Sequence, residues 1–212
     1  MAAVTTKKTG FFREEHHFRY LVDVWAPQRR RDTDADRRRL RLWSAACATG
    51  EEAYSLALTL GEAGLLPPTW DVRILATDID TLALADAEAG RYTAARASEV
   101  PAALLARGFE RPGAGDNLVA RRTLRDLVVF RPLNLIAATW PLQGRFDVIF
   151  CRNVLIYFAR DVQQRVVERL ISYVVPGGLL VLGHAETPLQ QHPELQRVSN
   201  TIYARPLGAV AV

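Results

Sequence analysis

The sequence is poor in the residues that build disulfide frameworks, metal sites and membrane spans. Its 212 residues include two cysteines, Cys47 and Cys151, and four histidines, and their spacing does not match a metal-ligand set. No apolar run approaches the roughly 20 residues of a membrane-spanning helix, and the first residues lack the pattern of a secretory signal peptide. We therefore expect a cytoplasmic protein with free thiols, no bound metal and no membrane insertion.

Charge is the next informative property. The formal net charge is +4, and much of it lies in two runs, Arg29–Arg31 and Arg37–Arg39 with Arg41. We favour a solvated linker here, and the alternative is a docking surface for an acidic partner. No aromatic residues interleave these arginines, so the stacking of nucleic-acid bases is not indicated. We expect no nucleic-acid partner.

Strand and helix patterns alternate along most of the chain, which favours an α/β fold with a doubly wound, mostly parallel, Rossmann-like sheet. A 212-residue chain suits one main domain. We expect strands at 40–45, 72–77, 127–131, 146–151, 179–182 and 201–205, and helices at 14–25, 51–63, 81–89 and 161–174.

The stretch from about residue 92 to residue 124 breaks this pattern. Glycines and a proline mark turns there, between short polar and apolar segments. We interpret it as a small β-subdomain inserted into the main domain. The predicted organisation is thus an N-terminal segment with a helix and a basic linker (1–38), followed by the main domain (39–212).

The most informative run is RLWSAACATGEEAYS at 41–55. A short apolar strand ends in small residues and Gly50, and an acidic helix start follows, as in the first turn of a doubly wound sheet beside a nucleotide-like ligand. Thr49 and Glu52 have the spacing of a capping box. Glu51 and Glu52 oppose a phosphate ligand and suit one with hydroxyls and a positive charge, such as S-adenosylmethionine. An ordinary capped helix is the alternative.

The next strand end favours the ligand. Asp78 follows an apolar strand, where an acid in dinucleotide-binding sheets contacts ribose hydroxyls. The interval from Gly50 is longer than usual, but Pro67-Pro68 lengthens the loop. We assign Asp78 to the ligand and Asp80 to the N-cap of the following helix.

A third strand end adds polar side chains to the same predicted crevice. Arg152, Asn153 and Tyr157 follow the buried strand at 146–151, and Asn134-Leu135 follow the strand before it. Each also has an ordinary interpretation. Arg152 could form a surface salt bridge, Asn153 could be a turn residue, and Tyr157 could be a core aromatic.

Taken together, these motifs resemble the chemotaxis-receptor glutamate methyltransferases of the CheR type. The resemblance runs from about residue 4 to residue 205. Its motifs are TGFFR (9–13), HHF (16–18), WSAACATGEEAYS (43–55), ATDIDT (76–81), NL (134–135), FDVIFCRNVLIYF (146–158) and GHAET (183–187).

The resemblance implies an S-adenosylmethionine-dependent enzyme that forms methyl esters on receptor glutamates. Arg13 and Tyr157 would lie near the transferred methyl group and the incoming glutamate. Such enzymes usually have asparagine where this chain has Lys7. The implied partners are glutamate-rich cytoplasmic helices of the receptors, and a receptor C-terminal tail held by the subdomain is a further possibility. The implied cofactor-binding residues are Lys7, Thr9, Arg13, Glu52, Asp78, Asn134, Leu135, Arg152 and Asn153.

An ionised glutamate is already a nucleophile, so this reaction needs positioning rather than a general base. Phe11, Phe12 or Trp43 could contact a sulfonium, although core packing is the favoured interpretation of all three. Two other functions remain open at this level. The chain could methylate nucleic acid or a small molecule, or it could bind the cofactor and signal without turnover.

Overall fold

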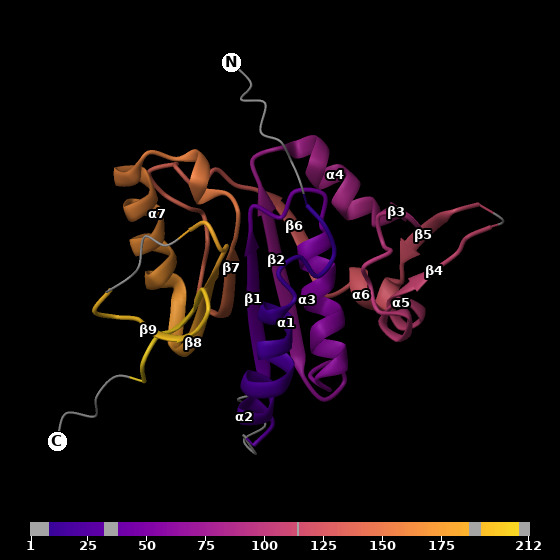
Figure 1. The fold of residues 1–212 in the computed structure, drawn as a ribbon, viewed down its shortest axis with the longest axis horizontal. Coiled ribbons are helices and arrows are strands. Elements are labelled where there is room, and N and C mark those ends of the chain that lie inside the picture. The colour runs from indigo at the N-terminus through magenta and orange to yellow at the C-terminus, as the bar shows by residue number, and fades with distance from the viewer. Residues whose placement is uncertain (1–8, 32–37, 114, 187–191, 208–212) are drawn as a thin grey trace.

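The main sheet has seven strands in the order β6-β2-β1-β7-β8-β10-β9 (Figure 1). The computed structural model describes residues 9–31, 38–113, 115–186 and 192–207. The five strands from β6 to β8 are parallel, and β10 and β9 extend the sheet antiparallel. This confirms the predicted fold class. The strands are β1 (Arg39–Ala45), β2 (Asp71–Asp78), β6 (Val128–Pro132), β7 (Phe146–Cys151), β8 (Val174–Leu182), β9 (Gln196–Ser199) and β10 (Ile202–Ala204).

Helices cover both faces of this sheet, so its central strands are buried on both sides. The N-terminal helix is continuous, with a π-helical turn in its middle, and lies beside α3 (Figure 1). No helix of the described residues is long and apolar enough to cross a membrane. The helices are α1 (His16–Tyr20), η1 (Leu21–Trp25), α2 (Ala26–Arg30), α3 (Glu51–Glu62), α4 (Thr81–Ala89) and α7 (Arg160–Tyr173).

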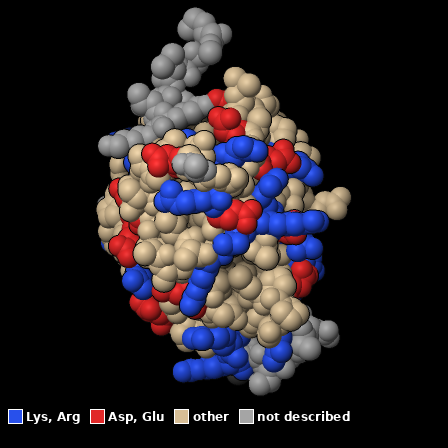
Figure 2. All heavy atoms as spheres, turned by 90° about the vertical axis from the view of Figure 1, so that its right-hand side faces the viewer, with Lys and Arg blue, Asp and Glu red and all other residues tan. Residues whose placement is uncertain are grey.

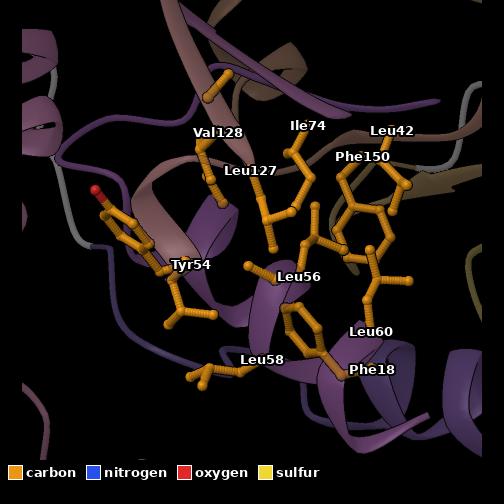
Figure 3. Packing of buried hydrophobic residues seen from close by; sticks show 14 of the residues in the cluster. Phe18, Leu42, Tyr54, Leu56, Leu58, Leu60, Ile74, Leu127, Val128 and Phe150 are labelled. Carbon is orange, nitrogen blue, oxygen red and sulfur yellow. The ribbon is translucent and has the colours of Figure 1, made fainter. Parts of the chain in front are cut away.

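Two hydrophobic cores flank the sheet, because successive strand residues point to opposite faces. Leu42 packs in the core beneath α1 and α3, where Leu56 and Phe150 also lie (Figure 3). The adjacent Trp43 packs in the other core with Leu170 of α7. The two cores fix the parallel strands between them, and the carboxyl ends of these strands lie at one edge of the sheet.

The predicted insertion forms a small antiparallel sheet of order β3-β5-β4, to one side of the main sheet (Figure 1). Tyr92 and Phe109 join the larger core through edge-to-face contacts with Phe11. The subdomain, defined here by its elements, is therefore packed onto the main domain. It consists of β3 (Arg91–Thr93), α5 (Ala102–Gly108), β4 (Phe109–Glu110), β5 (Asn117–Ala120) and α6 (Arg122–Arg125).

Helix starts agree with the sequence at one position and differ at two. The Asp80 carboxylate accepts hydrogen bonds from the Leu82 and Ala83 N–H groups, which confirms the predicted cap of α4. The prediction of a capping box formed by Thr49 and Glu52 was wrong. Gly50 is the N-cap of α3, with φ of 92°, and no side chain caps the helix. The predicted helix at 161–174 starts one residue earlier: α7 begins at Arg160, and Asp161 lies in its first turn and pairs with Arg165 at 2.8 Å.

The C-terminal third departs from the predicted boundaries. The sequence predicted a strand at 179–182, but β8 already begins at Val174. Gly177 takes a left-handed φ of 78° inside this strand, and the pairing with β7 shifts register there. The strand β9 was not predicted, because its exposed, polar sequence carries little apolar alternation. Both cysteines are buried free thiols, as expected.

Candidate active site

A cleft of about 430 Å³ opens where β1, β2, β6 and β7 end. Ligands of doubly wound sheets bind at this edge. Its walls come from the N-terminal segment, from the loops after the four strands and from the start of α3. The lining residues are Thr9, Gly10, Arg13, Ala46, Cys47, Ala48, Glu52, Asp78, Ile79, Leu133, Asn134, Leu135, Ile136, Arg152, Asn153, Val154, Ile156, Tyr157 and Phe158.

The loop between β1 and α3 is shaped by Asp78. The Asp78 carboxylate accepts the Ala48 N–H at 2.8 Å and the Asp80 N–H at 2.9 Å. Ala48 takes a left-handed φ of 49°, and Gly50 one of 92°. A Cβ atom at Gly50 would lie 2.8 Å from the Ala87 Cβ, so only glycine fits this turn. The carboxylate thus lies at the cleft wall and also organises the neighbouring wall.

The two acids at the start of α3 have different surroundings. Glu51 is buried, pairs with Arg96 and accepts the Thr49 hydroxyl, so it anchors the subdomain. Glu52 lines the cleft and accepts hydrogen bonds from Ser44 at 2.6 Å and Arg152 at 3.1 Å. Burial raises the pKa of Glu52, although Arg152 opposes the shift. Only Glu52 is therefore available to a ligand.

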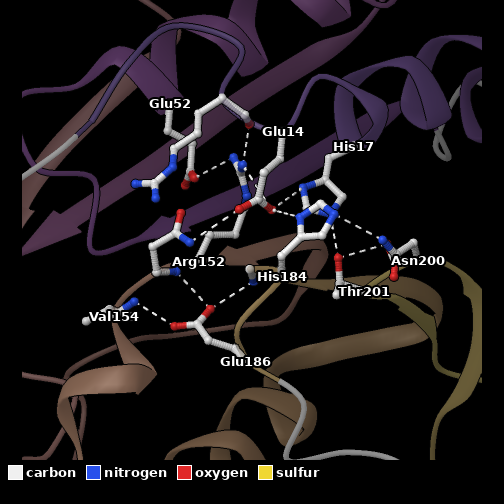
Figure 4. Close-up of polar contacts among 12 residues, drawn as sticks. Glu14, His17, Glu52, Arg152, Val154, His184, Glu186, Asn200 and Thr201 are labelled. Carbon is white, nitrogen blue, oxygen red and sulfur yellow. Dashed lines mark hydrogen bonds and ion pairs between the residues drawn. The ribbon is translucent and has the colours of Figure 1, made fainter.

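Arg152 is the central cation of the site (Figure 4). Its side chain is 2% exposed, which excludes the surface salt bridge considered from the sequence. The guanidinium bonds to Glu52, lies 3.5 Å from Glu14 and donates to the Arg13 carbonyl. Its Nε has no hydrogen-bond partner among the described residues. Arg152 thus connects the N-terminal segment to α3 across the cleft.

Histidines continue this network behind Glu14 (Figure 4). The Glu14 carboxylate lies 3.1 Å from His184. Burial raises the pKa of Glu14, but Arg152, His184, Asn153 and His17 together outweigh it, so the pKa is lowered. The His17 ring nitrogen Nε2 is 2.7 Å from the Thr201 hydroxyl. Burial, with the nearby Arg152, lowers the pKa of His17 to about 3, so this histidine is neutral at physiological pH. The network fixes the N-terminal segment against the end of the sheet.

Glu186 is a site residue that sequence reasoning missed. Its carboxylate is 2% exposed and accepts four backbone N–H groups, from Gly183, Asn153, Val154 and Leu155, at 2.6–2.8 Å. It thereby holds the loop after β7 against the end of β8. Asn153 itself has a left-handed φ of 57°. The available signal was the GHAET motif, in which an acid follows a buried strand.

All but one of the other predicted cofactor-binding residues lie at the cleft. Thr9, Arg13, Asn134 and Leu135 line it, as does Asn153. The Asn134 side chain also accepts the Ile136 N–H at 3.0 Å, as a turn residue does. Lys7 lies outside the described residues.

The aromatic residues resolve two further alternatives. Tyr157 lies in a 3₁₀ turn (η3, Leu155–Tyr157) at the cleft and is 50% exposed, so it is not a core aromatic. Phe11 and Trp43 are fully buried, and Phe12 packs against the same core as Phe11. Core packing, the favoured interpretation of these three, agrees with the structure.

Part of the basic linker is engaged within the fold. Arg29 pairs with Asp147 at 2.7 Å, and Arg41 pairs with Asp71 at 2.6 Å. Burial raises the pKa of Asp147, and its bonds to the Arg41 N–H and Arg29 oppose this. These arginines therefore anchor α2 and β1, while Arg37 lies outside the described residues.

The cleft fits S-adenosylmethionine by the chemistry of its side chains. Asp78 suits a ribose diol, Glu52 suits an ammonium group, and Arg13 suits a carboxylate. The buried Leu135 with the exposed Ile79 and Ile136 offers an apolar wall for a base. The doubly wound sheet and the side chains of this cleft are those expected of an S-adenosylmethionine-dependent methyltransferase.

Comparison with known proteins identifies the family of methyltransferases to which the chain is similar. Residues 7–204 match the family model described as the CheR methyltransferase SAM-binding domain. The chain is 44% identical to chemotaxis protein methyltransferase 2 of Pseudomonas aeruginosa, over 95% of this chain and 71% of that protein. It is 40% identical to the chemotaxis protein methyltransferase of Escherichia coli, over 95% of this chain and 68% of that protein. The chain belongs to the CheR methyltransferase family.

Proposed function

We propose that the cleft is where this enzyme forms methyl esters on glutamate side chains of chemotaxis receptors, with Arg13 and Tyr157 holding the incoming carboxylate. Membership of the CheR family establishes the reaction class. The observation that supports the proposed role of Arg13 is the hydrogen bond that fixes its backbone. Its carbonyl accepts a hydrogen bond from the buried Arg152, which also binds Glu52 at the cofactor side of the cleft.

The chain's work in this reaction is positioning. S-adenosylmethionine supplies, when bound, a methyl group activated by the sulfonium. Arg13 would hold one oxygen of the glutamate and leave the other to attack, since contact with both would weaken the nucleophile. The exposed Tyr157 hydroxyl would donate a second orienting hydrogen bond. No side chain needs to remove a proton, because the carboxylate is ionised at neutral pH.

The proposed cofactor contacts follow the placement of the lining residues. Asp78 would bind the ribose hydroxyls, Glu52 the ammonium group, and Asn134 with Leu135 the adenine. Thr9, Arg152 and Asn153 would complete the pocket. Lys7 is proposed on the sequence resemblance alone.

Replacing Asp78 by alanine is expected to weaken the binding of S-adenosylhomocysteine by about 1.5–3 kcal/mol, because hydrogen bonds to a charged group are lost. Titration calorimetry measures this. Asp80→Ala is the matched control: it removes an acid two residues away, which caps α4 and does not line the cleft. Equal affinities of the Asp78 variant and the wild type would contradict the assignment.

The finer partner assignments are also proposals. We propose that glutamate-rich receptor helices meet the cleft mouth and that a receptor tail adds to the subdomain sheet. The antiparallel strands β3 and β4 offer short edges for such addition. A cytoplasmic location is proposed from the two buried free thiols. We further propose the division predicted from the sequence: an N-terminal entry segment with a helix and a basic linker (1–38), followed by the methyltransferase domain (39–212) with its inserted subdomain (about 92–124).

A labelled-methyl assay tests the reaction. The enzyme is incubated with methyl-labelled cofactor and either a receptor fragment or an RNA oligonucleotide. Base-labile label on the receptor fragment is expected, since methyl esters hydrolyse in base and methylated amines do not. Label transferred to RNA, or base-stable label on the receptor fragment, would contradict the proposal.

Receptor docking is expected to depend on salt. Arg30 and Arg39 are exposed in the basic linker, and attraction between exposed charges is screened beyond about 8 Å at physiological salt. The methylation rate should therefore fall as salt rises from low to physiological. The same series is measured with and without the receptor tail. A methylation rate that does not change with salt and falls sharply without the receptor tail would assign docking to the subdomain instead.

A further inference from the structure

A second cleft, of about 550 Å³, lies apart from the cofactor cleft, on the side of the molecule that carries the subdomain. It shares no lining residue with the cofactor cleft. It runs along β6 and the helix before it. The lining residues include Arg122, Arg125, Asp126, Val128, Phe130 and Arg131.

One wall of this cleft is the open edge of the main sheet. The strand β6 is the outermost strand and pairs only with β2. The Leu127 carbonyl accepts from Ile74, and the Leu133 N–H donates to Asp78, so odd-numbered residues of this segment bond to β2. In a parallel strand the intervening residues direct their N–H and C=O groups the other way. The backbone groups of Val128 and Phe130 therefore face outward, along the cleft.

These outward groups are little used by the rest of the protein. The Phe130 carbonyl accepts a hydrogen bond from the Arg131 guanidinium at 2.7 Å. In the described parts of the chain, the N–H groups of Val128 and Phe130 have no backbone acceptor on the side facing away from β2. A strand edge whose backbone N–H groups face a cleft without an acceptor is a template for an added strand.

The second wall is basic. Arg122, Arg125 and Arg131 are all exposed. Arg122 approaches Asp126 at 3.4 Å, whereas Arg125 and Arg131 form no salt bridge among the described residues. The surrounding stretch 91–131 holds eight arginines and four acidic residues, a net charge of +4, which equals that of the whole chain. Figure 2 looks at the subdomain side and shows basic side chains projecting across it.

We propose that this cleft binds an extended acidic peptide segment of a partner protein, which adds to the free edge of β6 as a further strand. The open backbone groups of Val128 and Phe130 would pair with the main chain of the peptide. Arg122, Arg125 and Arg131 would pair with its carboxylates. Both features select the same ligand: the edge requires an extended peptide, and the charge requires an acidic one. Pro132, which has no N–H, limits the pairing to the preceding residues.

Fluorescence polarisation with a labelled hexapeptide of alternating glutamate and valine tests this binding. The triple variant Arg122→Glu, Arg125→Glu, Arg131→Glu is expected to bind it at least about tenfold more weakly, since three charge pairs become repulsive. The matched control is Arg30→Glu, Arg31→Glu, Arg39→Glu, which changes the charge equally in the basic linker and should bind within about twofold of the wild type. Circular dichroism and calorimetry with S-adenosylhomocysteine establish that both variants fold.

A second probe separates strand addition from simple charge attraction. The same peptide with N-methylated valines keeps its carboxylates and loses backbone donors, so its affinity should also fall about tenfold. Amide exchange of Val128 and Phe130 should slow when the unmodified peptide binds. Equal binding of both peptides, loss of binding in the basic-linker control, or tighter binding of a single-stranded RNA oligonucleotide would each overturn the proposal. So would the absence of any peptide binding.

Discussion

Replacing Glu186 by alanine is expected to lower the free energy of unfolding by about 3–5 kcal/mol, a large effect for one substitution. The carboxylate is the acceptor of four backbone N–H groups from two separate loops, and it is almost fully buried. Its removal leaves these donors without their protein acceptor. Urea denaturation followed by circular dichroism measures the change.

Glu194→Ala is the matched control, because it removes an exposed carboxylate whose partner is Arg205. We expect it to change stability by less than about 1 kcal/mol. The Glu186 variant should also bind S-adenosylhomocysteine more weakly, since the loop that carries Arg152 and Asn153 is released. A Glu186 variant as stable as the control would show that the loop holds its position without the carboxylate.

Replacing Arg13 by alanine is expected to lower the single-turnover methylation rate by about 100-fold while changing product affinity only modestly. The reason is that Arg13 is proposed to orient the glutamate, whereas most cofactor contacts come from other residues of the cleft. Rapid-quench measurements with a receptor fragment give the rate, and calorimetry with S-adenosylhomocysteine gives the affinity.

The comparison variant for Arg13 is Arg19→Ala, an exposed arginine of α1 that pairs with Glu15 and Glu62 outside the cleft. It should retain the wild-type rate. Parallel losses of rate and product affinity in the Arg13 variant would assign that residue to the cofactor rather than to the glutamate.

The sheet and most of the cleft were predictable because their signals are local. The apolar strands at 40–45 and 146–151 are buried on both faces, and such strands read as continuous apolar runs. Asp80 was assigned correctly to its helix, since capping depends on residues two and three positions away. Strand ends place their side chains together in any doubly wound sheet, which is why Asp78, Glu52 and Asn153 were predicted to share one crevice.

The missed features depend on partners far apart in the chain. Thr49 and Glu52 have capping-box spacing. However, the Glu52 carboxylate accepts hydrogen bonds from Ser44 and Arg152, and the Thr49 hydroxyl donates to Glu51. The spacing rule contains no information about Arg152, which is 100 residues away. Glu186 was missed for the same reason, because its four donors belong to the ends of two different strands.

The contact between His17 and Thr201 spans 184 residues of the chain. Contacts of such long sequence separation form late, since the loop that they close carries a large entropic cost. The His17–Thr201 contact can therefore form only after the turn before β10 has reached the sheet. Phe11, on the other side of Arg13, packs in the larger core without that contact. The short stretch that carries Arg13 and Glu14 is thus held at both ends, by the core at Phe11 and by Thr201 at His17, which leaves the guanidinium little freedom to move away from the cleft.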